Sequence, residues 1–484
     1  MSKYKELFKT SSILGVVQVL GLLSSVIRAK VISLLFGASG LGVFTILQST
    51  QQLILNISGF GLPVSGVKEI AAAREENESG RLSSLLQSIK GLNIVLASIA
   101  TLCCVLLSGV LDRTLLNGTA NYRVFLYLAG SIFFTQLYNS LYSIHQGLRS
   151  LKVIAYAGLI SNLVGITVAL PIFFFAGPDS ISISFLVLAF TSFFSIHLLG
   201  RKRLIDKTIA AKLPWVQTLR ASLPMLKLGF VLNLASLIGQ VVAYCIRLYI
   251  TKEGSLSELG YYSAVYSITY SYTGLFFTVL ATDFFPRIAS KVNNPNGLRD
   301  DVNRQIEFTL LILLPMMCVF SGLHETVIRL LYAEDFLVLK RMIVIAGFSN
   351  ILRSVSWALA YLLIAKGSSR FYFVNELIAG IYTVIINILC YHWLGLEGLA
   401  IALVLANAVY AVQMYIIVNR LVTFRLSKLN GMLLLAAVIT YGFMYLLHFT
   451  FAVAGSFVWI WVFIAAAIAF SLIVFRNSLR KNNA

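Results

Sequence analysis

Charged residues are scarce in this chain. Asp, Glu, Lys and Arg make up 12% of its 484 residues, whereas apolar residues make up 58%, and the mean hydropathy is +0.86. A soluble domain of this length needs a polar surface, which so few charges cannot provide. The composition therefore excludes an ordinary water-soluble protein and indicates a membrane protein.

Sequence signatures of enzymes and metalloproteins are missing as well. The chain contains no G-x-x-x-x-G-K-[ST] loop to hold ATP, and no polar stretch is long enough for a catalytic domain. The five Cys lie in apolar segments without metal-ligand spacing, and the five His are dispersed. We therefore expect no cofactor, no metal site and no enzymatic activity.

Apolar runs separated by short polar breaks fill the chain from Ser11 to Phe475. A spanning helix needs about 20 apolar residues, and about 14 such segments can be counted. Their interiors are rich in Ala, Gly and Leu and lack the period-two alternation of barrel strands. The sequence predicts an all-α integral membrane protein with about 14 transmembrane helices.

Basic residues outnumber acidic residues by 38 to 19. With the N-terminus inside, roughly 28 of the basic residues fall in cytoplasmic loops and about 6 fall outside. Basic residues in short cytoplasmic loops set orientation and attract anionic lipids. We therefore expect both termini to be cytoplasmic and anionic membrane lipids to be neighbours, and we expect no nucleic-acid partner, because the basic residues form no single face or arm.

The two halves of the chain resemble each other. In the first half, Arg28 is followed by an LG pair ending at Gly42, and in the second half Arg247 is followed by an LG pair ending at Gly260. The offset is 219 residues at the arginines and 218 at the glycines. Chance similarity between apolar helices is the alternative, but the joint match favours internal duplication, by which many transporters build two halves around a central site.

The duplication divides the chain into lobes. We predict two pseudo-symmetric six-helix lobes around a central cavity, at residues 1–200 and 224–425. A basic, amphipathic cytoplasmic linker at 201–223 joins them. Residues 426–484 add two further helices and a cytoplasmic tail.

Four cations lie within the apolar segments: Arg28, Lys30, Arg247 and Arg353. A charge at the bilayer centre costs roughly 2.5 to 3.5 kcal/mol on insertion scales, so such residues face protein, water or an anionic ligand. Arginine stays charged in a low-dielectric cavity and offers a planar fork to phosphate oxygens. We predict that these cations bind an anionic substrate; structural ion pairs are the alternative.

Polar side chains mark one face of the second helix. Gln48, Gln52 and Asn56 stand at i, i+4 and i+8. The offset of 218 carries the two glutamines onto Tyr266 and Tyr270. Amides and tyrosines hydrogen-bond to sugars and stack on them, so these residues are candidate substrate ligands. Interhelical hydrogen bonds and packing are the alternatives.

Two acidic residues are candidates for ion coupling. Asp283 lies at the cytoplasmic end of the eighth predicted span, and Glu376 lies just inside the eleventh. Each could titrate against a nearby arginine. A helix-end ion pair or cap is the alternative.

The chain resembles the polysaccharide exporters of the multidrug, oligosaccharidyl-lipid and polysaccharide (MOP) superfamily, which include flippases for O-antigen and other lipid-linked oligosaccharides. The resemblance covers most of the chain and rests on the duplicated plan, Arg28, the Gly37–Phe44 turn and the Gly59–Pro63 break. It implies alternating-access flipping of an undecaprenyl-diphosphate-linked oligosaccharide to the outer leaflet of a bacterial cytoplasmic (inner) membrane. The cavity arginines would bind the diphosphate, and a glycan polymerase and glycosyltransferases are candidate partners.

Three other functions fit the same pattern. The drug-exporting MATE branch of the superfamily handles mainly cations, which disagrees with a first pair of spans whose only acidic residue is Glu69. A lipid II flippase would share the predicted fourteen spans. A non-transporting membrane scaffold for glycan assembly would not need buried arginines.

Overall fold

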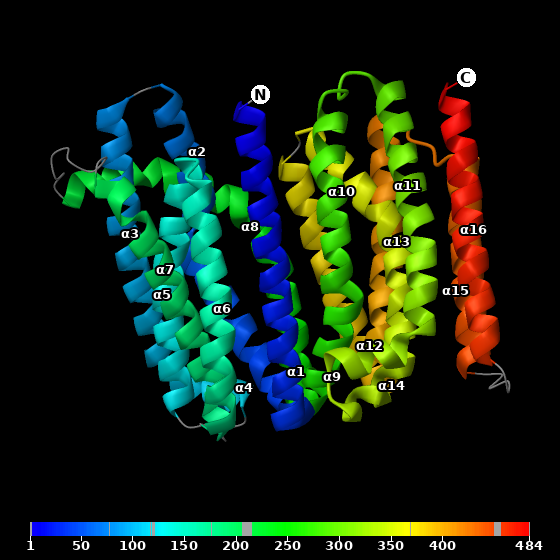
Figure 1. The fold of residues 1–484 in the computed structure, drawn as a ribbon, viewed down its shortest axis with the longest axis horizontal. Helices are drawn as coiled ribbons and strands as arrows, with labels where there is room; N and C mark the ends of the chain where they lie inside the picture. The colour runs from blue at the N-terminus through cyan, green and yellow to red at the C-terminus, as the bar shows by residue number, and fades with distance from the viewer. Residues whose placement is uncertain are drawn as a thin grey trace. The chain divides into compact units, whose positions relative to one another are not determined.

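The computed structural model describes residues 2–76, 78–116, 118, 122–175, 177–205, 215–367, 369–449 and 456–483. Every regular element in these ranges is a helix, so the predicted all-α fold is confirmed. The chain forms two compact units, Met1–Gly260 and Tyr261–Ala484. Each unit is a separate body of packed helices (Figure 1).

Unit 1 consists of the first eight α-helices and the start of the ninth. Their bounds are α1 (Ser2–Gly59), α2 (Leu62–Glu75), α3 (Ser79–Leu106), α4 (Ser108–Leu115), α5 (Tyr122–Gly147), α6 (Leu151–Phe175), η1 (Gly177–Asp179), α7 (Ser180–Ile205), α8 (Trp215–Glu253) and α9 (Leu256–Tyr266). Helix α5 packs against α3 and α7, and α8 packs against α1, α2 and α3. Leu62, Leu86 and Ile144 belong to a buried apolar core formed between helices of this unit.

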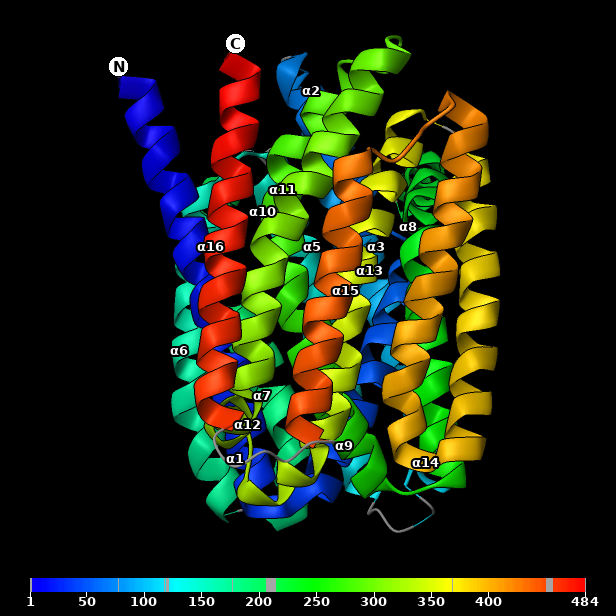
Figure 2. The same cartoon turned by 90° about the vertical axis from the view of Figure 1, so that its right-hand side faces the viewer.

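Unit 2 contains the rest of α9 and the remaining helices. These are the π-helical turn η2 (Ser267–Ser271), α10 (Tyr272–Ala289), α11 (Pro295–Gly322), α12 (His324–Leu331), η3 (Glu334–Leu339), α13 (Lys340–Ala365), α14 (Ser369–Val422), α15 (Lys428–Phe449) and α16 (Ser456–Asn483). Helix α11 packs against α13, α15 and α16. Figure 2 shows α15 and α16 at the front, and both pack on α11. Phe284, Leu310 and Tyr441 lie in the core of this unit.

Glycine turns divide the two longest helices. Helix α1 bends at Gly37 (φ 63°, ψ −159°) and α14 bends at Gly395 (φ 59°, ψ −142°). Positive φ is readily adopted by glycine, which has no β-carbon. A β-carbon at Gly398 would collide with the carbonyl oxygen of Cys390, eight residues earlier, which shows that α14 turns back on itself. Each of these helices therefore provides two spans.

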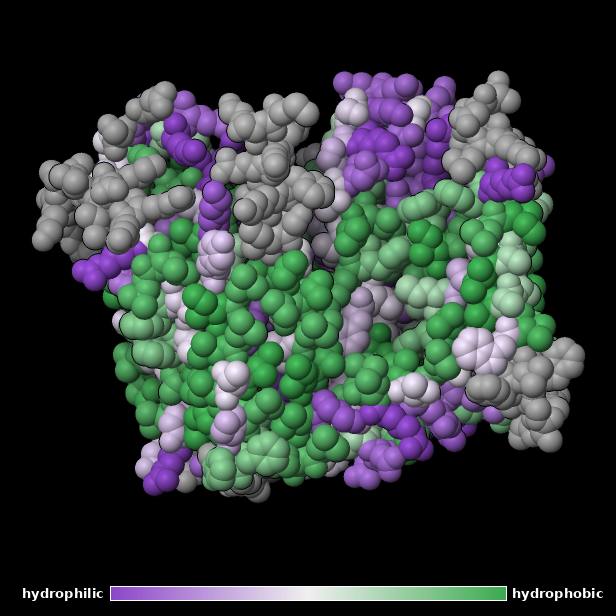
Figure 3. All heavy atoms as spheres, viewed as in Figure 1, coloured by the Kyte–Doolittle hydropathy of each residue, from purple (hydrophilic) through white to green (hydrophobic). Residues whose placement is uncertain are grey.

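The number of spans agrees with the sequence prediction. Among the described residues, eleven helical segments are long and apolar enough to cross a membrane. Counting each bent helix as two and adding the shorter apolar helix Trp461–Arg476 gives fourteen. Apolar side chains such as Phe175 and Trp393 are 89% and 72% exposed, as lipid contact requires. Figure 3 shows the surface in the view of Figure 1, with hydrophobic residues across its middle and hydrophilic residues toward its upper and lower ends. The protein is a multi-pass membrane protein.

The predicted linker at 201–223 lies partly outside the described residues, at 206–214. On either side of this gap, α7 ends at Ile205 and α8 begins at Trp215. The compact units divide after Gly260 and not at the linker, because α8 packs on helices of unit 1. The predicted lobes are defined by the repeat and not by packing, and that division stays a prediction.

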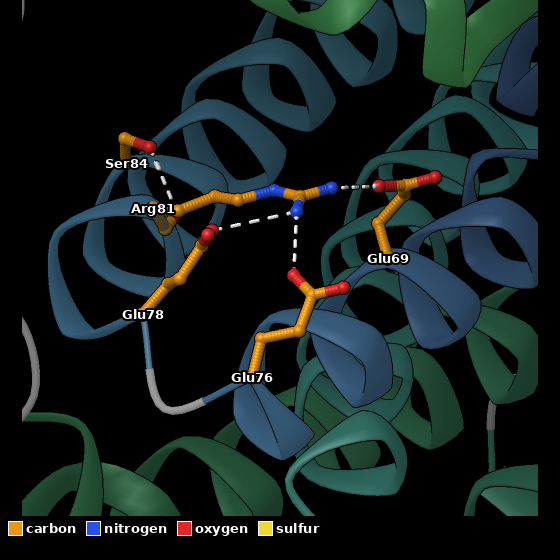
Figure 4. Close-up of polar contacts among 5 residues, drawn as sticks. All are labelled: Glu69, Glu76, Glu78, Arg81 and Ser84. Atoms are coloured by element: carbon orange, nitrogen blue, oxygen red, sulfur yellow. Dashed lines mark hydrogen bonds and ion pairs between the residues drawn. The ribbon is translucent and has the colours of Figure 1, made fainter.

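A cluster of ion pairs joins α2 to α3. Arg81 Nη1 lies 2.8 Å from Glu76 Oε2 and 3.4 Å from Glu78 Oε2, and its Nη2 lies 3.1 Å from Glu69 Oε2 (Figure 4). The Arg81 side chain is 44% exposed, so solvent screens these pairs. The shared arginine connects α2, the turn after it and the start of α3. The first turn of α2 borders the candidate site described next.

Candidate functional site

Helices α1 and α8 of unit 1 meet along a polar seam. Arg247 Nη1 donates a hydrogen bond of 2.8 Å to Ser49 Oγ. One turn away, Thr50 Oγ1 donates to the Tyr244 hydroxyl at 3.4 Å. Polar groups within a membrane protein hydrogen-bond across helices, because lipid offers them no partner. This requirement explains why the polar face of each helix turns toward the other.

Asn56 occupies the centre of the seam. Its Nδ2 donates to Gln240 Oε1 and to the carbonyl of Gln52, the latter at 3.1 Å. Asn233 Nδ2 donates to Asn56 Oδ1 at 3.2 Å. Asn56 therefore links one turn of α1 to two turns of α8. Asn56 thus makes interhelical hydrogen bonds, and its role as a substrate ligand stays a prediction.

A cavity of about 390 Å³ lies beside Asn56. Its lining comes from α1, the turn into α2, α5 and α8: Gln52, Leu55, Asn56, Gly59, Gly61, Pro63, Val64, Gln136, Asn139, Asn233 and Gln240. Six of these eleven residues carry side-chain amides, and none is charged. An amide offers both donors and acceptors. The cavity can therefore hydrogen-bond to hydroxyl and amide groups of a neutral polar ligand.

Four of the amides were not predicted from the sequence. Gln136 and Asn139 stand three residues apart on α5, and Asn233 and Gln240 stand seven apart on α8. Both spacings place the pair on one helix face, which is the signal that could have found them. The predicted Gln52 and Asn56 line the cavity, whereas the half-buried Gln48 is not among the lining residues.

Arg28 lies on α1 before the glycine turn and is half-buried. Its Nε is fully buried and has no hydrogen-bond partner, and no carboxylate in the described part of the chain pairs with it. A buried charge is costly unless a partner neutralises it. Lys30, two residues on, is half-buried too. The position of Arg28 thus fits a cation that receives its counter-charge from a ligand.

Arg353 of unit 2 has a different environment. Its guanidinium carbon lies 3.8 Å from the centre of the Tyr270 ring and 4.7 Å from that of Phe277. Its Nη1 donates to the Tyr270 carbonyl at 3.1 Å. Aromatic faces attract such cations. Much of the guanidinium surface is therefore already in contact with protein.

The same tyrosine is part of the π-helical turn η2. The rings of Tyr266 and Tyr270 stack at 5.0 Å with planes 25° apart. Asn350 Nδ2 donates to the Thr269 carbonyl at 2.7 Å. A π-turn disturbs the regular helical hydrogen bonds, and such turns are frequent at functional sites. Asn350 and Arg353 of α13 satisfy two carbonyls of this turn and hold the tyrosine pair in place.

The two acidic candidates differ in burial. Glu376 is half-buried and accepts hydrogen bonds from the Tyr410 hydroxyl at 2.7 Å and Asn375 Nδ2 at 3.2 Å. No cation in the described part of the chain pairs with it. The Asp283 side chain is 82% exposed and pairs with Arg287 at 3.4 Å. Only Glu376 thus has the sheltered, neutral surroundings expected of a coupling carboxyl.

The fold is that of MOP transporters. The structure is similar to lipid II flippase MurJ in an inward closed conformation, with 18% identity, a TM-score of 0.67, and coverage of 98% of this chain and 99% of MurJ. An inward-facing MATE multidrug transporter of the MOP superfamily is similar too, with 17% identity and a TM-score of 0.70. The match covers 84% of this chain and 94% of that transporter. A MOP transporter from Pyrococcus furiosus, described as having a binding pocket of reversed polarity, has 18% identity and a TM-score of 0.56. The match covers 85% of this chain and 93% of that transporter. No curated protein matches the chain.

The sequence of the chain identifies its family. Residues 64–341, more than half of the chain, match the family model described as polysaccharide biosynthesis protein. The chain belongs to this family. The predicted kinship with polysaccharide exporters is therefore confirmed.

Proposed function

We propose that this protein flips an undecaprenyl-diphosphate-linked oligosaccharide, such as an O-antigen repeat unit, across a bacterial cytoplasmic membrane by alternating access. The observation that carries the proposal is the cavity of unit 1, in which six amide side chains and no charged residue form the lining. A glycan presents many hydroxyl groups and no charge that would need a counter-ion. Amides match such a ligand because they both donate and accept.

The diphosphate would bind to Arg28 and Arg247, the intramembrane arginines of α1 and α8. Arg247 stands seven residues beyond Gln240 on α8, or about 10 Å along the helix. Arg28 brings a cation with a buried, unpartnered Nε. A guanidinium remains charged at membrane depth and can hold two phosphate oxygens at once. Lys30 and Gln48 remain candidate substrate ligands, and both are half-buried on α1.

A lipid II flippase is the second candidate. The structural match to MurJ extends over 98% of this chain, including α15 and α16, whereas the match to the multidrug transporter covers 84%. Drug export is disfavoured, because a cationic drug needs carboxylates and the cavity lining has none. The Pyrococcus furiosus transporter is a precedent for a MOP pocket of reversed polarity.

We further propose that both termini lie on the cytoplasmic side and that two lobes, at 1–200 and 224–425, rock about the substrate. Glu376 is our candidate for coupling this motion to a proton gradient. A glycan polymerase and glycosyltransferases would act on the same lipid-linked glycan before or after its transfer. They are therefore the protein partners that we propose.

The test is a flipping assay in liposomes with the purified full chain. Fluorescent undecaprenyl-diphosphate oligosaccharide and fluorescent lipid II are each supplied, and transfer is measured as protection from a membrane-impermeant quencher. We expect transfer of the oligosaccharide, at least about tenfold loss in Arg28→Ala and Arg247→Ala, and partial activity in Arg247→Lys, which keeps the charge but not the fork. Arg113→Ala, at an exposed position of α4, is the matched control.

Two results would overturn the proposal. Faster transfer of lipid II than of the oligosaccharide would favour the second candidate. Normal transfer by both alanine variants, inserted at wild-type levels, would show that the arginines do not bind the diphosphate.

A further inference from the structure

A second cavity, of about 430 Å³, lies in unit 2. It is bounded by the last turns of α10, the first half of α11 and the helix α16, and its lining falls into a charged part and an apolar part. The charged and amide residues are Asp283, Arg287, Arg304, Gln305 and Glu307. The apolar residues are Val279, Leu280, Phe308, Leu311 and Phe475. The cavity therefore offers a polar surface and an apolar surface to one occupant.

The charged part contains both signs in equal number. Arg287 Nη2 donates to Gln305 Oε1 at 2.9 Å and lies 3.4 Å from Asp283 Oδ2. Its Nε is fully buried and has no partner, and the same holds for Glu307 Oε1. Arg304 is exposed at the rim. The cavity therefore presents two guanidinium groups and two carboxylates to one occupant.

The apolar part faces outward. Val279 is 68% exposed and Phe308 is 36% exposed. The rings of Phe308 and Phe475 lie 6.2 Å apart and connect α11 to α16. Large exposed apolar side chains on a membrane protein are in contact with lipid chains. The cavity therefore lies where a charged layer borders the hydrocarbon surface of the helices.

We propose that this cavity binds a zwitterionic phospholipid with a primary ammonium headgroup, phosphatidylethanolamine. The guanidinium groups of Arg304 and Arg287 would donate to the phosphate. Glu307 and Asp283 would accept from the ammonium, and the acyl chains would lie on the two phenylalanines. An anionic lipid fits less well, because two carboxylates balance the two arginines. A choline headgroup fits less well too, because its nitrogen has no N–H to donate.

The experiment uses the full-length protein in detergent with equal amounts of dioleoyl phosphatidylethanolamine, phosphatidylcholine and phosphatidylglycerol. Native mass spectrometry measures which lipid each variant retains. We expect the wild type to retain phosphatidylethanolamine about tenfold better than phosphatidylcholine, since a lost charge-assisted hydrogen bond has an effect of that size. Arg304→Ala and Glu307→Gln should each abolish the preference. Arg329→Ala, an exposed arginine of α12 outside the cavity, should keep it.

Three results would overturn the inference. The first is equal retention of the ethanolamine and choline lipids by the wild type. The second is strongest retention of phosphatidylglycerol, which would indicate an anion site. The third is an unchanged preference in both cavity variants. The isosteric Glu307→Gln and the exposed position of Arg304 keep the fold intact, so a lost preference reports on the cavity.

Discussion

Arg353 shows how the surroundings of a residue decide between two roles. Sequence alone made it a candidate phosphate ligand, because it is a cation in an apolar span. In the structure it stacks 3.8 Å above Tyr270 and donates to the carbonyl of the same residue. We infer that Arg353 positions Tyr270 within the π-turn and does not itself bind the diphosphate.

Replacing Arg353 should therefore lower stability first. A partly desolvated cation–π contact contributes about 0.5 to 2 kcal/mol. We expect Arg353→Ala to destabilise unit 2 by about 2 kcal/mol and Arg353→Lys by about half of that, because lysine keeps the charge but cannot stack as a plane. Thermal unfolding in detergent measures both, with Arg329→Ala as the control. Wild-type stability combined with lost transport in Arg353→Lys would instead assign the arginine to the substrate.

Glu376 gives the second prediction at this scale. It is half-buried and its hydrogen-bond partners are the neutral groups of Tyr410 and Asn375. A carboxyl in such a site can take up and release a proton without breaking an ion pair. We expect an imposed pH gradient to accelerate flipping by the wild type and by Asp283→Asn, but not by Glu376→Gln. If Glu376→Gln still responds to the gradient, coupling lies elsewhere or is absent.

At the scale of elements, the start of α9 crosses α1 just after its glycine turn. A β-carbon at Gly42 would collide with the carbonyl of Leu256, and one at Gly260 would collide with the carbonyl of Ala38. All four residues belong to unit 1. The repeat offset of 218 carries Ala38 onto Leu256 and Gly42 onto Gly260. The crossing is therefore reciprocal, and it supports the duplication that the sequence suggested.

This reciprocity predicts matched effects. Gly42→Ala and Gly260→Ala should each destabilise the protein by about 1 to 3 kcal/mol, because backbone must move to admit the methyl group. The double variant should be less destabilised than the sum, since both substitutions separate the same two helices. Gly239→Ala is the control: nothing lies near that helical glycine, so the change should be neutral or slightly stabilising. Additive losses would show that the two contacts are independent.

The helices could be predicted and the cavity could not, for one physical reason. A transmembrane span can be recognised from about 20 consecutive apolar residues, which is local information in the sequence. Even the turns at Gly37 and Gly395 lie where two predicted spans adjoin. The cavity amides come from separate helices and meet only through packing. Gln52 and Asn56 were found because a short helix segment carries both, whereas Gln136 needed knowledge of which helix neighbours α1.

At the scale of the whole molecule, successive connections between the fourteen spans must lie on alternate sides of the membrane. The α2–α3 region and the ends of α5, α7, α10 and α14 are rich in Lys and Arg. The connections near Gly37, Gly177 and Gly395 contain no basic residue within two positions of the glycine. Because cytoplasmic loops carry the basic excess, this alternation predicts which end of each helix faces the cytoplasm.

That alternation predicts the orientation of the protein in the membrane. A reporter fused after Gly177 should fold outside, so alkaline phosphatase should be active there and green fluorescent protein dark. A reporter after the last residue should show the reverse, because an even number of spans returns the chain to the side on which it began. Fusion after Gly147, at the end of α5, is the matched cytoplasmic control one span earlier. Phosphatase activity both after Gly177 and at the C-terminus would contradict the even number of spans. Activity after Gly147 and at the C-terminus, with none after Gly177, would reverse the orientation and the direction of the proposed transfer.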